Sequence, residues 1–167
     1  MKNSLVHPSA VIEPGAKIAN DVSIGPFSFI GAEVVLHSGV EIKSHVVITG
    51  STEIDQETVV YPFAVVGEIP QDLKFSGEKT SLRIGKRNRI REHVTINTGT
   101  AGGGGLTLVG NDCLFMAGSH IAHDVTIGDR VIIANSGAVA GHCVIEDEVI
   151  IGGLSGIHQF VRIGRGA

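Results

Sequence analysis

Branched aliphatic residues or Phe recur at every sixth position, from Val6 to Val66 and again from Val109 to Ile163. An α-helix returns to one face every 3.6 residues and a flat strand every two, so neither explains this period. A period of six is typical of a parallel β-helix, in which each short strand forms one side of a prism. The pattern therefore predicts an all-β solenoid with its core along the axis and almost no helix.

A second inward position accompanies each core residue. The fourth residue after the core position is usually small or β-branched, as at Ala16, Ser28 and Val40. Two such positions per hexad, together with the absence of Trp, indicate a narrow interior. Glycine often follows the core residue, as at Gly25 and Gly110, and we expect these glycines to form corners with positive φ.

Two segments interrupt the period, and we predict that both protrude from the wall. The first spans about residues 67–83, and the repeat resumes in phase at Ile84. The second spans about residues 97–108 and contains the run Gly102–Gly105. Insertions in a solenoid gather on one side and often serve binding. The glycine run lacks the Lys-Ser/Thr and helix of a P-loop, so we interpret it as a flexible loop.

Composition narrows the possible classes of protein. The 167 residues show no strong break and are treated as one domain, 1–167. The net charge of −4 argues against a nucleic-acid binder. Neither a signal peptide nor an apolar stretch of about 20 residues is present, so we expect a cytoplasmic chain without membrane insertion. Cys113 and Cys143 follow core residues at the small position, which favours buried thiols over a disulfide.

The period also places candidate chemistry. Three hexads complete a coil of 18 residues, so residues 18 apart should stack at about 4.8 Å. His120 and His158 lie close to the two ladders that this spacing predicts. One ladder contains His123, Gly141 and Gln159, and the other contains Asp124, His142 and Phe160.

His123 and Asp124 form the best candidate for general acid–base chemistry. Histidine titrates near neutral pH, and a neighbouring carboxylate can fix its tautomer. Adjacent strand residues point to opposite sides, so Asp124 would have to reach round a corner. Gly141 would let a backbone N–H approach a developing oxyanion. No G-x-S-x-G elbow indicates a covalent serine mechanism.

Several stretches, together with the hexads, resemble the UDP-N-acetylglucosamine O-acyltransferases of lipid A biosynthesis. The hexads alone indicate only the larger superfamily of hexapeptide-repeat transferases. The resemblance covers the whole chain. The stretches are residues 69–75 (IPQDLKF), 88–92 (NRIRE), 103–107 (GGGLT), 120–124 (HIAHD), 140–142 (AGH) and 157–160 (IHQF).

This resemblance implies a left-handed parallel β-helix and a homotrimer with active sites between subunits. It implies transfer of an (R)-3-hydroxyacyl group from acyl carrier protein to the 3-hydroxyl of UDP-N-acetylglucosamine. His123 would be the general base, Asp124 its supporting carboxylate and Gly141 the oxyanion donor. No metal or bound cofactor is implied. The implied substrate-binding residues are Gln71, Asp72, Lys74, His120, His142, His158 and Gln159.

The chain departs from the family in two places. Thr98 stands where members usually carry Arg, and the sequence ends at Ala167 in mid-coil, without the family's C-terminal helical domain. We expect weakened nucleotide binding and an exposed strand edge. A basic cluster could steer the acidic acyl carrier protein or could be a solvated face. The cluster contains Lys86, Arg87, Arg89 and Arg91.

Three alternatives stay open. One is the N-acyltransferase of the same pathway, in which a His base would serve an amine. Another is a trimeric zinc hydratase with His120, His123 and His142 as ligands, since three His and an open position is valid zinc chemistry. The third is a non-catalytic scaffold whose histidines only line a subunit interface. A truncated, inactive chain would belong to this third class.

Overall fold

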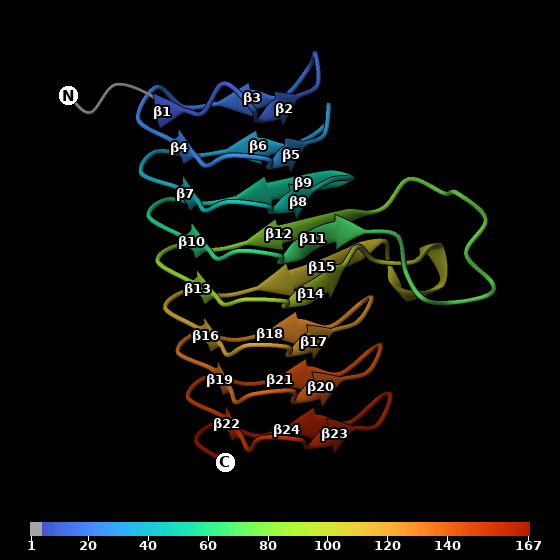
Figure 1. Cartoon of the computed structure of the whole chain (residues 1–167). Coiled ribbons are helices and arrows are strands. Elements are labelled where there is room, and N and C mark those ends of the chain that lie inside the picture. The colour runs from blue at the N-terminus through green and yellow to red at the C-terminus, as the bar shows by residue number, and fades with distance from the viewer. Residues whose placement is uncertain (1–4) are drawn as a thin grey trace.

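Three parallel sheets of eight strands each form the sides of a prism (Figure 1). The computed structural model describes residues 5–167, so the first four residues of the predicted domain lie outside the described part. The coils stack as a left-handed parallel β-helix, which confirms the predicted fold class. The one helical element in residues 5–167 is a 3-10 turn, η1 (Ala101–Gly103).

Consecutive strands pass from one sheet to the next. Sheet A contains β1 (Leu5–Val6), β4 (Ser23–Ile24), β7 (Glu41–Ile42), β10 (Val59–Val60), β13 (Arg89–Ile90), β16 (Leu114–Phe115), β19 (Ile132–Ile133) and β22 (Ile150–Ile151). Sheet B contains β2 (Val11–Ile12), β5 (Phe29–Ile30), β8 (Val47–Ile48), β11 (Val65–Glu68), β14 (Thr95–Asn97), β17 (His120–Ile121), β20 (Ala138–Val139) and β23 (Gly156–Ile157). Sheet C contains β3 (Lys17–Ile18), β6 (Val35–Leu36), β9 (Ser51–Ile54), β12 (Ser81–Ile84), β15 (Leu106–Val109), β18 (Thr126–Ile127), β21 (Val144–Ile145) and β24 (Arg162–Ile163).

The hexad residues form the core, as the period predicts. Ile30 and Ile121 are fully buried, and so is Val46 at the second inward position. Strand pairs such as Val11 with Phe29 lie 18 residues apart, which confirms three hexads per coil. Most hexad residues of the first and last coils, namely Ile12, Ile18, Ile157 and Ile163, are only partly buried, because no further coil covers them.

The corners differ from the sequence-based expectation. Of the glycines that follow core residues, Gly25 and Gly110 do not have positive φ. A Cβ at Gly25 would instead lie 2.7 Å from the backbone of the next coil, so glycine permits close stacking there. Positive φ occurs at the third residue after the core position, for example at Asp124 (58°) and His142 (62°).

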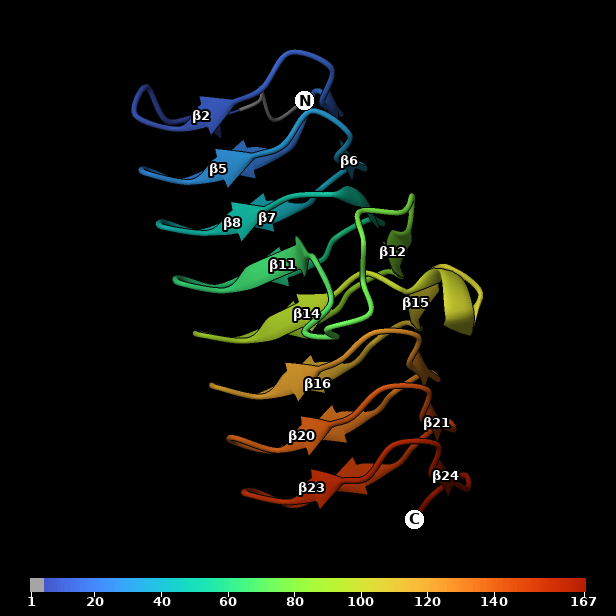
Figure 2. The same ribbon diagram turned by 90° about the vertical axis from the view of Figure 1, so that its right-hand side faces the viewer.

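The two predicted loops leave sheet B and return to sheet C, and they protrude from the same edge (Figure 1, Figure 2). The first joins β11 to β12, so that Ile84 pairs with Ile54 at a spacing of 30 residues. The second joins β14 to β15 and contains η1, so that Val109 pairs with Ile84 at a spacing of 25. The extra residues relative to a plain coil form the loops.

Two further expectations concern the cysteines and the membrane. Cys113 and Cys143 are free and buried, as predicted. No helix within residues 5–167 has the length and apolar character needed to cross a membrane.

Candidate functional site

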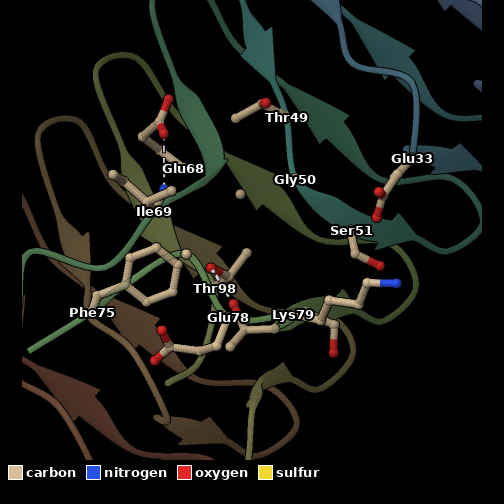
Figure 3. Close-up of a pocket in the computed structure, with 14 residues that line it drawn as sticks. Glu33, Thr49, Gly50, Ser51, Glu68, Ile69, Phe75, Glu78, Lys79 and Thr98 are labelled. Atoms are coloured by element: carbon tan, nitrogen blue, oxygen red, sulfur yellow. Dashed lines mark hydrogen bonds between the residues drawn. The ribbon is translucent and has the colours of Figure 1, made fainter. Parts of the chain in front are cut away.

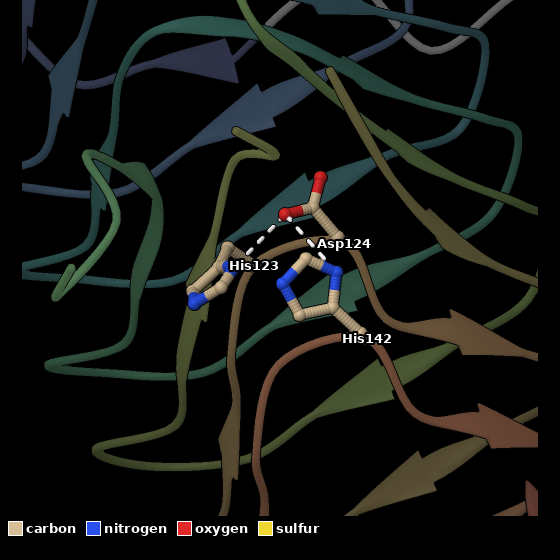
Figure 4. Close-up of side chains that lie close together, drawn as sticks. All are labelled: His123, Asp124 and His142. Atoms are coloured by element: carbon tan, nitrogen blue, oxygen red, sulfur yellow. Dashed lines mark hydrogen bonds and ion pairs between the residues drawn. The ribbon is translucent and has the colours of Figure 1, made fainter. Parts of the chain in front are cut away.

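His123 and Asp124 meet at the corner between β17 and β18. The imidazole Nδ1 lies 2.8 Å from the carboxylate Oδ2 (Figure 4). Their side chains converge, rather than pointing to opposite sides, because Asp124 adopts the left-handed conformation. The left-handed corner thus supplies the turn that Asp124 needs to reach its neighbour.

This pair is shielded from solvent. The Asp124 side chain is 1% exposed and that of His123 is 7% exposed. The carboxylate also accepts hydrogen bonds from the backbone N–H of Thr100 (2.8 Å) and its hydroxyl (2.6 Å). The N–H of Asp124 donates to Thr107 Oγ1 at 2.9 Å. Every polar group of Asp124 that faces the interior therefore has a partner, as a buried charge requires.

The next coils continue the two predicted ladders. His142 N donates to His123 O, and Phe160 N donates to Gly141 O. The rings of His142 and Phe160 stack at 4.6 Å, whereas those of His123 and His142 meet edge to face at 5.0 Å. The predicted stacking of residues 18 apart is confirmed.

A cavity of about 520 Å³ opens beside His123. Its walls come from sheet B and from Gln71 of the first loop. Gly141 is required there, because a Cβ would lie 2.5 Å from the His123 ring. Six predicted residues line this cavity, namely Gln71, His120, His123, Gly141, His158 and Gln159.

The other predicted residues lie on the far side of the corner. Asp72 and Lys74 of the first loop line a second cavity of about 510 Å³ together with His142 and Phe160. Asp124 lines neither cavity and lies buried at the corner. The structure thus divides the predicted set between two cavities that flank the His123–Asp124 corner.

His120 differs from its neighbour in its electrostatic surroundings. Burial lowers the pKa of His120, and the nearby His123 acts in the same direction. The backbone of Thr95 opposes this lowering of the His120 pKa. The Thr95 hydroxyl also lies 2.7 Å from His120 Nδ1. The neutral ring is therefore favoured at this position.

Comparisons with known proteins agree with the sequence resemblance. A family model described as bacterial transferase hexapeptide, six repeats, matches residues 107–141. The acyl-[acyl-carrier-protein]–UDP-N-acetylglucosamine O-acyltransferase of Paracoccus denitrificans is 72% identical over 109 residues, which are 65% of this chain and 42% of the relative. The protein of the same name from Rhizobium johnstonii is 51% identical over 166 residues, which are 99% of this chain and 61% of the relative. The solved structure of LpxA from Acinetobacter baumannii has a TM-score of 0.94 at 49% identity, covering 95% of this chain and 61% of that one.

The chain is a homologue of these O-acyltransferases. It spans less than two thirds of the length of the curated relatives that it matches. The resemblance drawn from the hexads and short motifs is thereby confirmed.

A third cavity, of about 510 Å³, lies under the first loop of this O-acyltransferase homologue (Figure 3). Thr98 lines it, is buried, and accepts a hydrogen bond of 3.0 Å from the Thr80 hydroxyl. Phe75 and Lys79 of the first loop line other parts of it. Sequence analysis noted Thr98 only as a departure from the family and did not predict this cavity.

The structure gathers a different metal-ligating set from the one that the zinc alternative predicts. Ligand atoms of His123, Asp124 and His142 lie within 4.8 Å of one another, whereas His120 is not in this group. Within residues 5–167 this is the one such cluster.

The predicted basic cluster is partly compensated in this homologue. Arg87 forms an ion pair with Asp112 at 2.7 Å, and Arg91 forms one with Glu92 at 2.9 Å. The carboxylates of Asp112 and Glu92 cancel the positive charge of the two arginines. Less positive charge is therefore left to steer an acidic partner.

Sequence reasoning missed Thr100 and Thr107, which bind Asp124. Both belong to the interruption that we interpreted as a flexible loop. A Thr near a glycine-rich run carries no distinctive signal, because Ser and Thr are common in loops. The structure shows that this loop packs on the buried carboxylate.

Proposed function

We propose that the chain transfers an (R)-3-hydroxyacyl group from acyl carrier protein to the 3-hydroxyl of UDP-N-acetylglucosamine, the first step of lipid A biosynthesis. The observation that carries this proposal is the buried His123–Asp124 pair at the wall of a cavity. The names of the homologous proteins supply the substrates.

His123 is the proposed general base. An ionised carboxylate only accepts hydrogen bonds, so Nδ1 facing Asp124 carries the hydrogen and Nε2 keeps its lone pair. Within residues 5–167, Nε2 has no hydrogen-bond partner, and the ring lines the cavity. The sugar hydroxyl gives its proton to Nε2 as its oxygen attacks the thioester carbonyl. The C–S bond then breaks, and the proton passes to the departing thiolate.

Gly141 is the proposed oxyanion donor. Its backbone N–H donates to no acceptor among residues 5–167, whereas those of Ala140 and His142 are both engaged. Gly141 lines the same cavity as His123. A free N–H beside the base suits the negative oxygen of the tetrahedral intermediate.

The two cavities that flank the corner suit two substrates. Gln71, Asp72 and Lys74 follow one another on the first loop, yet they face different cavities. We assign this loop to the acyl hydroxyl and the sugar nucleotide, with Lys74 as the cationic group at the second cavity. The thioester is already activated, and both Asp124 oxygens accept hydrogen bonds. We therefore propose that the reaction needs no metal or cofactor.

A homotrimer is the proposed assembly, with acyl carrier protein as the transient partner. The positions directly before the core residues of sheet B carry no charged side chain, although Glu68 is exposed at the end of β11. The corresponding positions of sheet C include Lys17, Glu53 and Arg83. Uncharged outward surface favours contact with another subunit. The cavity beside His123 opens along this sheet, so a second copy would help to enclose it. The outward positions are Val11, Phe29, Val47, Val65, Thr95, His120, Ala138 and Gly156.

The deciding experiment measures acyl transfer from (R)-3-hydroxyacyl carrier proteins of several lengths. The acceptors are UDP-N-acetylglucosamine and its 3-amino analogue, which distinguishes a hydroxyl nucleophile from an amine. We expect His123→Ala to lower kcat by about 10²- to 10⁴-fold. His7→Ala is the matched control, because His7 is exposed and, among residues 5–167, its side chain hydrogen-bonds only to Ser9. Equal rates in both variants would refute the proposed base.

A further inference from the structure

The glycine-rich loop holds the carboxylate that supports His123. Thr100 binds both oxygens of Asp124, one through its backbone N–H (2.8 Å) and the other through its hydroxyl (2.6 Å). Oδ2 is the oxygen that also faces His123 Nδ1. One residue of the loop therefore fixes the rotation of the carboxylate that fixes the imidazole.

The loop can pack so closely because two of its residues lack side chains. A Cβ at Gly103 would lie 2.0 Å from Asp124 Cγ, and one at Gly99 would lie 2.8 Å from Oδ1. Neither glycine has positive φ, so the requirement at both is for space rather than for backbone freedom. The neighbouring Gly102 has no atom within 4 Å of its position for a Cβ.

The loop itself is shaped around Thr100. The carbonyl of Thr100 accepts hydrogen bonds from Gly103 N (3.1 Å) and Gly105 N (2.8 Å), which closes the turn over the carboxylate. The N–H of Ala101 donates to Glu78 Oε1 of the first loop at 3.3 Å. The loop that carries the proposed substrate contacts is thus joined to the loop that holds Asp124.

We propose that Thr100 is a positioning residue, which acts through Asp124 to hold His123 in the tautomer and orientation that acyl transfer needs. This proposal rests on the proposed function, since it concerns the residue that positions the general base of that reaction. A carboxylate without its hydroxyl donor can rotate, and the imidazole then loses its fixed partner. Thr100 does not line the cavity that contains His123, although it does line the second cavity with Asp72 and Lys74. Its hydroxyl is engaged by Asp124 Oδ2, so the loss of this hydroxyl acts on the base.

The test compares Thr100→Val, which removes the hydroxyl but keeps the shape and the N–H, with Thr100→Ser, which keeps both donors. We expect Thr100→Val to lower kcat on the order of 10-fold, with little change in KM, because a supporting partner of a base is lost. Thr100→Ser should restore kcat to within about 2-fold, since its hydroxyl can donate to the same oxygen. Equal kcat in both variants would overturn the proposal.

A spectroscopic measurement separates this proposal from the proposed function. The Nδ1–H of His123, bound to a carboxylate, should give a downfield proton resonance that is protected from exchange and disappears in His123→Ala. We expect Thr100→Ser to retain this resonance and Thr100→Val to lose it through exchange. If the unsubstituted chain transfers no acyl group, the proposed function fails, yet the resonance still decides whether Thr100 holds the pair. A resonance unchanged in Thr100→Val would refute the positioning role.

A second pair of variants guards against misfolding of Thr100→Val. Gly103→Ala places a methyl against the Asp124 carboxylate, whereas Gly102→Ala adds the same methyl to the same loop in open space. We expect Gly103→Ala to lose the His123 resonance and Gly102→Ala to keep it, with circular dichroism showing β-helix in both. The same resonance in the two variants would contradict the close packing on which the proposal depends.

Discussion

Replacing Gly141 by Ala offers a direct test of the geometry around His123. The added Cβ would lie 2.5 Å from His123 Cε1 and 2.7 Å from Nε2, whereas ordinary contacts begin at 3.4 Å. The backbone tolerates Ala here, because Gly141 does not have positive φ. The imidazole must therefore move by roughly 1 Å, a misplacement that can cost about 10²-fold in rate.

The hydrogen bond to Asp124 sharpens this prediction. Asp124 is fixed by Thr100 and Thr107, so it cannot follow the displaced ring. We expect Gly141→Ala to lower kcat about 100-fold while its free energy of unfolding changes by no more than about 1 kcal/mol. The backbone N–H that we assign to the oxyanion is unchanged, so the loss would report on the base alone.

The assay is steady-state acyl transfer at saturating concentrations of both substrates, with urea unfolding measured in parallel. Gly164→Ala is the matched control, because no atom lies within 4 Å of its added Cβ and its φ is not positive. We expect the control to keep the original kcat. Unchanged turnover in a folded Gly141→Ala variant would refute the assignment of His123 as the base.

Three further predictions concern the body of the β-helix. Burial raises the pKa of the Cys113 thiol to about 11 and also raises that of Cys143, so neither should react with iodoacetamide at pH 8. Mass spectrometry showing rapid alkylation of the folded chain would contradict this. Burial lowers the pKa of His120, so the unfolded chain binds more protons below the ordinary histidine value of about 6.5. The stability that this group contributes is present above that pH and is lost as the pH falls, and His120→Gln should reduce the shift in urea midpoint between pH 7 and pH 5. Ile121→Ala should lower the free energy of unfolding by roughly 2–5 kcal/mol, because Ile121 is fully buried. Ile163→Ala in the partly buried last coil should cost less than half as much, and equal losses in urea titrations would argue against the core assignment.

The period of six predicts the core because the same positions of every hexad place their side chains inward. Ile30 and Val46 could be assigned to the interior without knowing how the corners are built. The spacing of 18 residues then brings Gly141 one coil from His123, which the structure confirms. Stacking of distant residues was therefore predictable wherever the period is unbroken.

Corner conformation could not be predicted from residue type. The left-handed position is occupied by residues as different as Asp124, His142 and Phe160, although such φ values cost non-glycine residues about 1–2 kcal/mol each. Hydrogen bonds between coils, such as His142 N to His123 O, accompany these corners and offset that cost. Local preference is thus overridden by stacking. The pairing of Asp124 with His123 was predicted, but the left-handed conformation that brings the two side chains together was not.

The phase of the repeat explains why loops and dyad lie together. The corners that follow one sheet form one edge of the prism, and both loops and the His123–Asp124 corner follow sheet B. Because each loop leaves the wall one or two coils before β17, it can fold along that edge and bring Gln71 and Thr100 to the pair. An insertion after a strand of sheet A or sheet C would project from another edge and could not reach it. Counting hexads modulo three is therefore enough to tell, from sequence, which insertions can serve this site. The hexad residues that share this sheet are Ile12, Ile30, Ile48, Val66, Ile96, Ile121, Val139 and Ile157.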